Sequence, residues 1–197
     1  MSAKKLAMAA VLGGLTFFVW GALSHTIIPF SENALLGFTN EEAVTQAILA
    51  GSPKSGVYFL PYMPQGMEKM SPEEASAARH EAEEKMARGP FMLASVHLGE
   101  MGSMGNLLVT QLVTDILAAL FICLALMKVK GLSFWNQVTA IEFIGLAGFA
   151  AVNLPQWNWY AFSGAFTLAE LFDTAVGFFL AGMVIAKINP QIQSPAS

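Results

Sequence analysis

The sequence predicts an integral membrane protein, mainly α-helical, with a four-transmembrane-helix bundle and a small α+β extramembrane domain between the first and second spans. Of its 197 residues, 55% are hydrophobic and only 12% are charged, which is too apolar for an ordinary soluble domain. Four apolar runs are each long enough to cross a bilayer. Ten of the fourteen acids lie between Glu32 and Glu100, so this segment is expected in water.

Residues 1–24 are predicted to form a transmembrane anchor helix. The apolar run Leu6–Leu23 has about the minimum length of a span. It could also be a signal peptide, because Ala22-Leu23-Ser24 is an acceptable cleavage site. Aromatic residues such as Trp20 suit a membrane interface better than a signal core. We therefore expect an anchor that is retained.

Residues 25–105 are predicted to form a periplasmic α+β domain. Two helix starts are marked by Thr39-Asn40-Glu41-Glu42 and Ser71-Pro72-Glu73-Glu74, which combine capping residues with acids in the first turn. The runs Gly56–Leu60 and Phe91–Leu98 have strand composition. We expect them to pair, with the helix Ser71–Arg88 crossing between them. The domain has too few apolar residues to complete its own core, so packing on the bundle or on a partner is expected.

Residues 106–188 are predicted to form a three-helix transmembrane bundle, followed by a cytoplasmic tail at 189–197. The spans are Asn106–Met127, Phe134–Leu154 and Ser163–Ile188, with Pro155–Tyr160 as a loop. If the spans alternate, five lysines fall on one side of the membrane, and by the positive-inside rule that side is the cytoplasm. This predicts a multi-pass protein of the bacterial inner (cytoplasmic) membrane with both termini cytoplasmic. The lysines are Lys4, Lys5, Lys128, Lys130 and Lys187.

The predicted spans carry acidic residues along their apolar runs, whereas their lysines, Lys4, Lys5 and Lys187, lie only at the ends. Because a helix rises about 1.5 Å per residue, the acids reach comparable depths and could form one layer. Three interpretations stay open. They are carboxyls that hold helices together, a proton or cation path, and a site for Mg²⁺, Mn²⁺ or iron, although the Glu-x-x-His pattern of that class is absent. The predicted cluster comprises Asp115, Glu142, Glu170, Asp173 and Gln111.

A second candidate surface is aromatic. It is predicted to be either a membrane-interface belt or a contact for a partner helix, a pigment or a quinone at the periplasmic interface. Its histidine is expected to be hydrogen-bonded at a helix end rather than to act as a ligand. The residues are Trp20, His25, Trp157, Asn158, Trp159 and Tyr160.

Several function classes are not supported by the sequence. The only cysteine is Cys123, which excludes an intrachain disulfide. No nucleophile and base are suitably placed, and phosphate loops and dinucleotide fingerprints are absent. A net charge of −4 does not indicate a nucleic-acid partner. We therefore predict no enzyme, no catalytic residue, and no defined cofactor or metal site.

Thioethers at Met63, Met67 and Met70 with His97 leave copper binding open, and flexible packing is the plainer explanation.

Segments spread over most of the chain resemble a family of small bacterial inner-membrane proteins to which no activity is assigned. They are Trp20–His25 followed by Pro29, Ser55–Tyr58, Gly89-Pro90, Leu154–Trp159 and Leu180–Lys187. The resemblance implies a bacterial source and a non-enzymatic role.

The leading hypothesis is an accessory or scaffold subunit of a larger inner-membrane complex, respiratory or photosynthetic. Its partners would be other integral membrane subunits and the lipid bilayer. The alternative is a proton- or cation-coupled transport or sensing protein that uses the carboxylate cluster.

Overall fold

The computed structural model describes residues 2–28, 34–62 and 65–189. Pro29, Met63 and the predicted tail from residue 190 therefore lie outside the described residues. The chain divides into two compact units. The bundle unit comprises 1–36, 102–158 and 162–197, and the small unit comprises 37–101 with 159–161.

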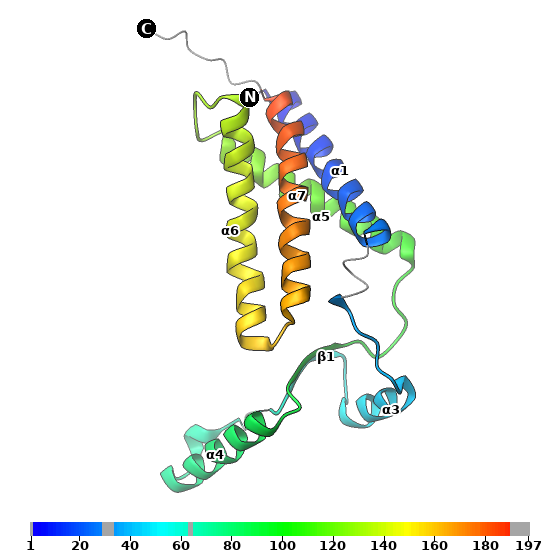
Figure 1. Ribbon diagram of the computed structural model, residues 1–197, viewed down its shortest axis with the longest axis vertical. Coiled ribbons are helices and arrows are strands. Elements are labelled where there is room, and N and C mark those ends of the chain that lie inside the picture. The colour runs from blue at the N-terminus through cyan, green and yellow to red at the C-terminus, as the bar shows by residue number, and fades with distance from the viewer. Residues whose placement is uncertain (1, 29–33, 63–64, 190–197) are drawn as a thin grey trace. The chain divides into compact units, whose positions relative to one another are not determined.

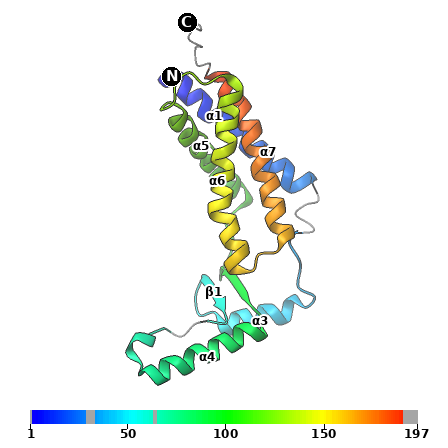
Figure 2. The same ribbon diagram turned by 60° about the vertical axis from the view of Figure 1, so that its left-hand side comes forward.

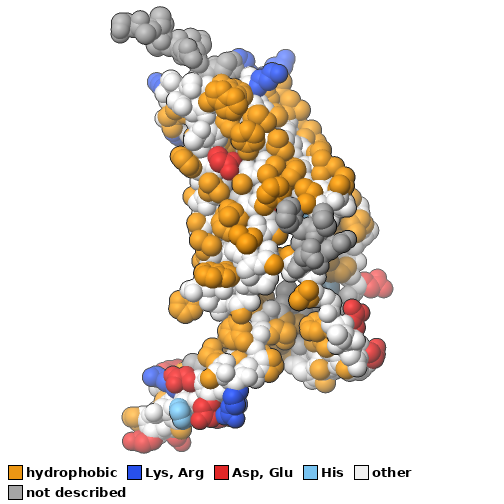
Figure 3. Space-filling view, viewed as in Figure 1, with side chains coloured by type: hydrophobic (Ala, Val, Ile, Leu, Met, Phe, Trp, Pro, Cys, Tyr) orange, Lys and Arg blue, Asp and Glu red, His pale blue; other side chains and the backbone are white. Residues whose placement is uncertain are grey.

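Four helices are long and apolar enough to cross a membrane, as the sequence predicted. They are α1 (Ala3–Ile27), α5 (Met104–Leu126), α6 (Phe134–Tyr160) and α7 (Gly164–Ile188). In both ribbon views α6 and α7 run side by side (Figures 1 and 2). The space-filling view shows hydrophobic side chains over most of the visible face of this unit (Figure 3), which is the surface expected of a bundle in lipid.

Serine side chains cap the start of all four of these helices. Ser2, Ser103, Ser133 and Ser163 each accept a hydrogen bond from the backbone N–H three residues later. Such a bond satisfies one of the N–H groups that a helix start leaves without a partner, and it contributes about 1 kcal/mol. The helix boundaries are therefore encoded locally.

Glycines let α1 pack closely between α5 and α7. A Cβ atom added at Gly14 would lie 2.5 Å from the Ile116 Cα of α5, and one at Gly13 would lie 2.8 Å from the Ile185 Cγ1 of α7. A side chain at Gly14 would require a shift of the backbone, whereas one at Gly13 would require the Ile185 side chain to move. Gly21 of the same helix differs, because a Cβ atom added there would meet nothing within 4 Å.

The buried core of the bundle joins all four helices. On α6, Gly145 faces the Phe178 ring of α7 so closely that an added Cβ would overlap it. Ile141 packs against Gly182 of α7 at 3.5 Å from the position of an added Cβ. The core cluster consists of Ala9, Ala119, Ile122, Cys123, Leu126, Ile141 and Ile185.

The sequence predicted a loop at Pro155–Tyr160, and this prediction is wrong, because helix α6 continues through these residues to Tyr160. Proline removes one backbone N–H, yet its fixed φ is compatible with a helix when neighbouring hydrogen bonds persist. The helix ends at Tyr160, and the next residue, Ala161, has a φ of 58°. The Phe162 N–H then donates to the Gln156 carbonyl at 3.4 Å, which ties the start of the turn back to the end of α6.

The small unit contains α3 (Glu41–Gly51), β1 (Gly56–Leu60), the 3₁₀ turn η1 (Met67–Lys69), α4 (Pro72–Arg88) and β2 (Met92–Val96). The predicted pairing of the two strands is confirmed. They are antiparallel, with Gly56 opposite Val96 and Leu60 opposite Met92. Antiparallel strands need no handed crossover, so α4 lies in the connection between them without that constraint.

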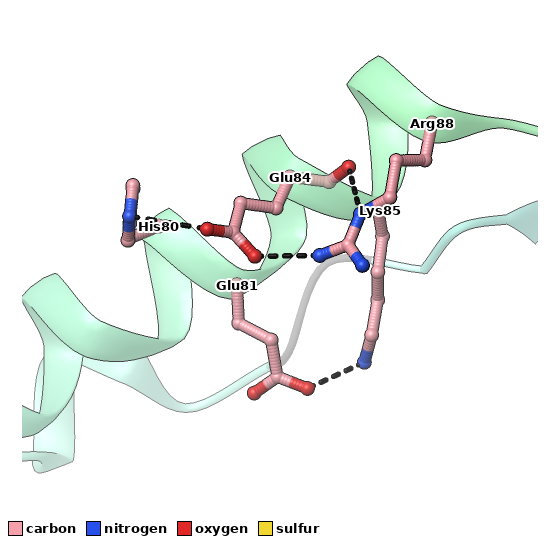
Figure 4. Close-up of polar contacts among 5 residues, drawn as sticks. All are labelled: His80, Glu81, Glu84, Lys85 and Arg88. Atoms are coloured by element: carbon pink, nitrogen blue, oxygen red, sulfur yellow. Dashed lines mark hydrogen bonds and ion pairs between the residues drawn. The ribbon is translucent and has the colours of Figure 1, made fainter.

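Helix α4 begins at the predicted Ser71 cap, where Ser71 and Glu74 form a reciprocal capping box. Figure 4 shows its other polar contacts. Arg88 donates to Glu84 at 2.6 Å, His80 lies 3.4 Å from the same carboxylate, and Lys85 donates to Glu81 at 2.6 Å. These pairs are exposed and one helical turn apart, so each contributes only a few tenths of a kcal/mol.

Helix α4 buries little of its surface. Ala82 is buried, whereas Met86, one turn further along, is 39% exposed. The described part of the small unit buries few residues altogether: Ser52, Pro61 and Ala82.

Candidate functional site

Two of the predicted intramembrane acids line one groove in the bundle. Asp115 on α5 and Asp173 on α7 both contribute to its wall, as do His25 and Gln111. Its volume is about 590 Å³, and we call it the carboxylate groove. The remaining lining includes Phe17, Phe18, Trp20, Gly21, Ala22, Thr26, Leu108, Thr174, Gly177 and Phe178.

The Asp115 carboxylate is held by its own helix. Gln111 Nε2 donates to Asp115 Oδ1 at 2.9 Å, one turn away. The Thr114 hydroxyl donates to the Gln111 carbonyl at 2.8 Å, so it too is used within α5. Gln111 thus orients the carboxylate but does not link α5 to another helix.

Asp173 is tied to α1 through its backbone. Trp20 Nε1 donates to the Asp173 carbonyl at 3.1 Å. The side chain is different, because its Oδ1 is buried and accepts no hydrogen bond from the described residues. Buried polar atoms are normally paired, so this oxygen has hydrogen-bonding capacity that the described protein groups leave unused.

A smaller cavity of about 120 Å³ shares His25 and Asp173 with the carboxylate groove and adds Glu170 to the lining. The Asn153 side chain of α6 lies close to the Glu170 carboxyl of α7. A polar contact between α6 and α7 at this point is of the kind that the packing interpretation of the acids requires.

His25 is hydrogen-bonded at the end of α1, as the plainer interpretation predicted. Its Nδ1 lies 2.9 Å from the Gly21 carbonyl and 3.1 Å from the Ser24 hydroxyl. Because a carbonyl only accepts, Nδ1 carries the proton in the neutral ring, and Nε2 is left as an acceptor.

Glu142 does not line either of these cavities. Its Oε2 is buried without a partner among the described residues. The structure therefore brings Asp115, Asp173, Glu170 and His25 to the walls of two cavities, and a layer that includes Glu142 stays a prediction. Within the described ranges, no group of three or more His, Cys, Asp or Glu side chains is arranged to hold a metal ion.

The aromatic candidates divide into two sets. Trp157, Trp159 and Tyr160 are 53%, 71% and 41% exposed near the end of α6, where Asn158 is exposed as well. Trp20 instead packs between helices, with its ring 3.1 Å from the position of a Cβ at Gly177.

The sequence reasoning missed the part that two phenylalanines play in the groove wall. Phe17 and Phe178 meet edge to face with ring centroids 4.9 Å apart. The spacing of three between Phe17 and Trp20 places both on one helix face, and this was the available signal.

In the small unit, Met67 is half-buried and Met70 and His97 are exposed. Copper binding by these residues stays a prediction, and Met63 lies outside the described residues.

The fold defines a mainly helical chain with four candidate membrane spans and a small two-stranded unit. Comparison with models of protein families, with curated proteins and with solved structures finds no match.

Proposed function

We propose that this chain is an accessory or scaffold subunit of a larger bacterial inner-membrane complex, respiratory or photosynthetic. In this proposal the small unit is periplasmic, both termini are cytoplasmic, and the four long helices pack against other membrane subunits. The observation that carries the proposal is the lack of a core in the small unit, whose buried described residues are Ser52, Pro61 and Ala82.

Large apolar side chains of the small unit are instead exposed. Val57 is 71% exposed, Tyr62 59%, Leu49 55% and Leu60 45%. A soluble surface with this much exposed apolar area is typical of a protein contact. A two-stranded sheet is also marginal without further packing. A partner that covers these side chains would supply the missing core.

The exposed aromatic side chains at the end of α6 support the same proposal. Trp157 and Trp159 are exposed by more than half. Tryptophan and tyrosine are enriched both at membrane interfaces and at the energetic centres of protein interfaces. A subunit or a pigment or quinone of the complex would contact them.

Gentle detergent extraction followed by native electrophoresis and mass spectrometry of the band tests the proposal. We expect the chain to migrate with other membrane subunits, at a mass well above its own 21.1 kDa. Migration alone, after extraction from its native membrane in several mild detergents, would contradict it.

The second candidate function is proton- or cation-coupled transport or sensing. It is favoured by the placement of Asp115, Asp173 and His25 on one groove, because ionisable groups at membrane depth commonly mark ion paths. Flux into liposomes distinguishes the two functions. Transport requires Asp115→Asn and Asp173→Asn to abolish flux in a folded protein, whereas a purely structural role predicts no flux in the wild type. The sequence predicted that Glu142 acts together with Asp115 and Asp173. The substitution Glu142→Gln therefore tests whether the transport path extends beyond the groove.

A further inference from the structure

We propose that residues 34–38, called here the interfacial segment, dip into the bilayer surface at the His25 end of α1 and bind lipid through Leu35, Leu36 and Phe38. The occupant of this surface is the boundary region of the membrane, where lipid headgroups meet the acyl chains. The inference rests on the proposed membrane placement of the four long helices, but not on the accessory role.

The interfacial segment carries large apolar side chains that the described protein leaves uncovered. Leu35 is 66% exposed, Leu36 is 88% exposed and Phe38 is 61% exposed. No charged residue lies between Ala34 and Asn40, so nothing in this stretch opposes contact with hydrocarbon. Neighbouring exposed apolar side chains of this size are typical of a surface that binds a membrane or another protein.

The start of the interfacial segment lies against the ends of two long helices. Ala34 and Leu35 line the cavity of about 120 Å³ together with His25 of α1 and with Phe166 and Phe172 of α7. All of these residues belong to the bundle unit. The depth of these two helix ends in a bilayer therefore sets the depth of the segment.

Both helices place these ends at the edge of the hydrocarbon. A hydrocarbon core of about 30 Å takes about 20 residues of helix, because each residue rises about 1.5 Å. Counted from Leu6, which follows the lysines at the start of α1, the core ends close to His25. Counted back from Ala186, which precedes the lysine at the other end of α7, the core ends close to Thr167. Since Leu35 lines one cavity with residues at both of these levels, it lies where acyl chains meet headgroups.

The lipid-facing surface of the two spans reaches the same level. Ile27 of α1 is 70% exposed and Leu168 of α7 is 67% exposed, so apolar side chains continue to the ends of both helices. The uncovered side chains of the interfacial segment extend this surface. Leucine and phenylalanine on a segment that lies in the membrane plane bury about 5–10 Å into the boundary between headgroups and acyl chains.

The test places a nitroxide spin label on introduced cysteines of the full-length chain in phosphatidylcholine nanodiscs. No other protein is present, so the result does not depend on the accessory role. Leu36→Cys reports on the interfacial segment. Val113→Cys, at a site 59% exposed near the middle of α5, reports on lipid, and Met86→Cys, at a site 39% exposed on the charged helix α4, reports on water. The native Cys123 is fully buried, and the wild type treated with the label measures its background.

Oxygen is enriched in hydrocarbon and a nickel chelate stays in water, so their relative effects on the relaxation of the label report its depth. We expect the label on Leu36→Cys to respond more strongly to oxygen than to the chelate, as on Val113→Cys, and the label on Met86→Cys to show the reverse order. The reverse order on Leu36→Cys, with Val113→Cys in lipid, would overturn the proposal and leave the membrane placement intact. A water-like response of Val113→Cys would contradict the membrane placement itself and the proposal with it.

An added charge tests whether the apolar side chains hold the segment in lipid. With the label on Phe38→Cys, the further substitution Leu36→Glu should shift the response from oxygen toward the nickel chelate, because a carboxylate is costly beside hydrocarbon. Gln65→Glu is the matched control, because it adds the same charge at an exposed position outside the segment, and it should leave the response unchanged. Both positions are exposed, so neither substitution removes a buried side chain. Equal responses of the two variants would refute the binding of lipid through Leu36.

Discussion

The indole N–H of Trp20 on α1 donates to the backbone carbonyl of Asp173 on α7 at 3.1 Å. The bond fixes α1 against α7 at the residue whose side chain lines both cavities. It also explains why Gly177, one turn further along α7, lies against the same indole ring. This contact therefore contributes both to the packing of α1 on α7 and to the geometry of the groove.

Trp20→Phe should lower the free energy of unfolding of the bundle by about 1 kcal/mol, since it removes the hydrogen bond and keeps most of the ring. Thermal unfolding in detergent, followed by circular dichroism, measures the change. Trp135→Phe is the control, because Trp135 is 62% exposed on α6. Equal effects of the two substitutions would contradict the role of the Trp20 bond.

Gly14→Ala should destabilise the bundle by about 1–3 kcal/mol, because its Cβ would lie 2.5 Å from the backbone of Ile116 and would force α1 away from α5. Gly21→Ala is the matched control on the same helix. It meets nothing within 4 Å and should be neutral or stabilising, by up to about 1 kcal/mol, through helix propensity. Unfolding midpoints of the two variants in one detergent give the comparison, and a Gly14→Ala variant as stable as the wild type would argue against close contact.

Ala161→Gly should stabilise the turn between α6 and α7. Ala161 has a φ of 58°, a conformation that costs a residue with a Cβ about 1–2 kcal/mol and glycine little. Ala165→Gly, at the second residue of α7, should give no such gain and should instead destabilise by up to about 1 kcal/mol. Thermal unfolding of both variants distinguishes a stabilisation specific to the turn conformation from a general effect of glycine on stability.

The start of α4 should depend on pH through Glu74. The backbone N–H of Ser71 and then its hydroxyl lower the pKa of Glu74 below its ordinary value of 4.5. A lowered folded-state pKa stabilises the helix above the ordinary value, and the contribution is lost as the pH falls through the lowered pKa. Amide hydrogen exchange of residues 73–76 should therefore accelerate below about pH 4.5 relative to the rest of α4. Glu74→Gln should remove most of this dependence, and Glu73→Gln, a neighbouring acid outside the capping box, should not.

Val57→Glu should release the chain from its complex if the exposed face of the small unit contacts a partner. Val57 is 71% exposed on β1, so the substitution introduces a charge without removing a buried side chain. Gln65→Glu adds the same charge at another exposed position of the unit and should leave the complex intact. Native electrophoresis of detergent extracts reports both, and identical migration of the two variants with the wild type would mean that this face is free.

The sequence by itself determined the features that depend on neighbouring residues. Four apolar runs have the length of a span, and they appear as α1, α5, α6 and α7. Asn40 and Ser71 cap α3 and α4 where the pattern predicted, because a cap joins a side chain to backbone only three residues away. The two strands were also recognisable from composition and flanking glycine and proline.

Only the tertiary structure decided which residues meet. Gly14 contacts another helix and Gly21 does not, although both are glycines of one apolar run, because the contact depends on how α1 is rotated and where α5 crosses it. Asp115 and Asp173 share a groove from which Glu142 is absent for the same reason. The antiparallel direction of β1 and β2 and the passage of α6 through Pro155 likewise depend on surroundings that lie beyond the local sequence, since long-range packing can override a local preference.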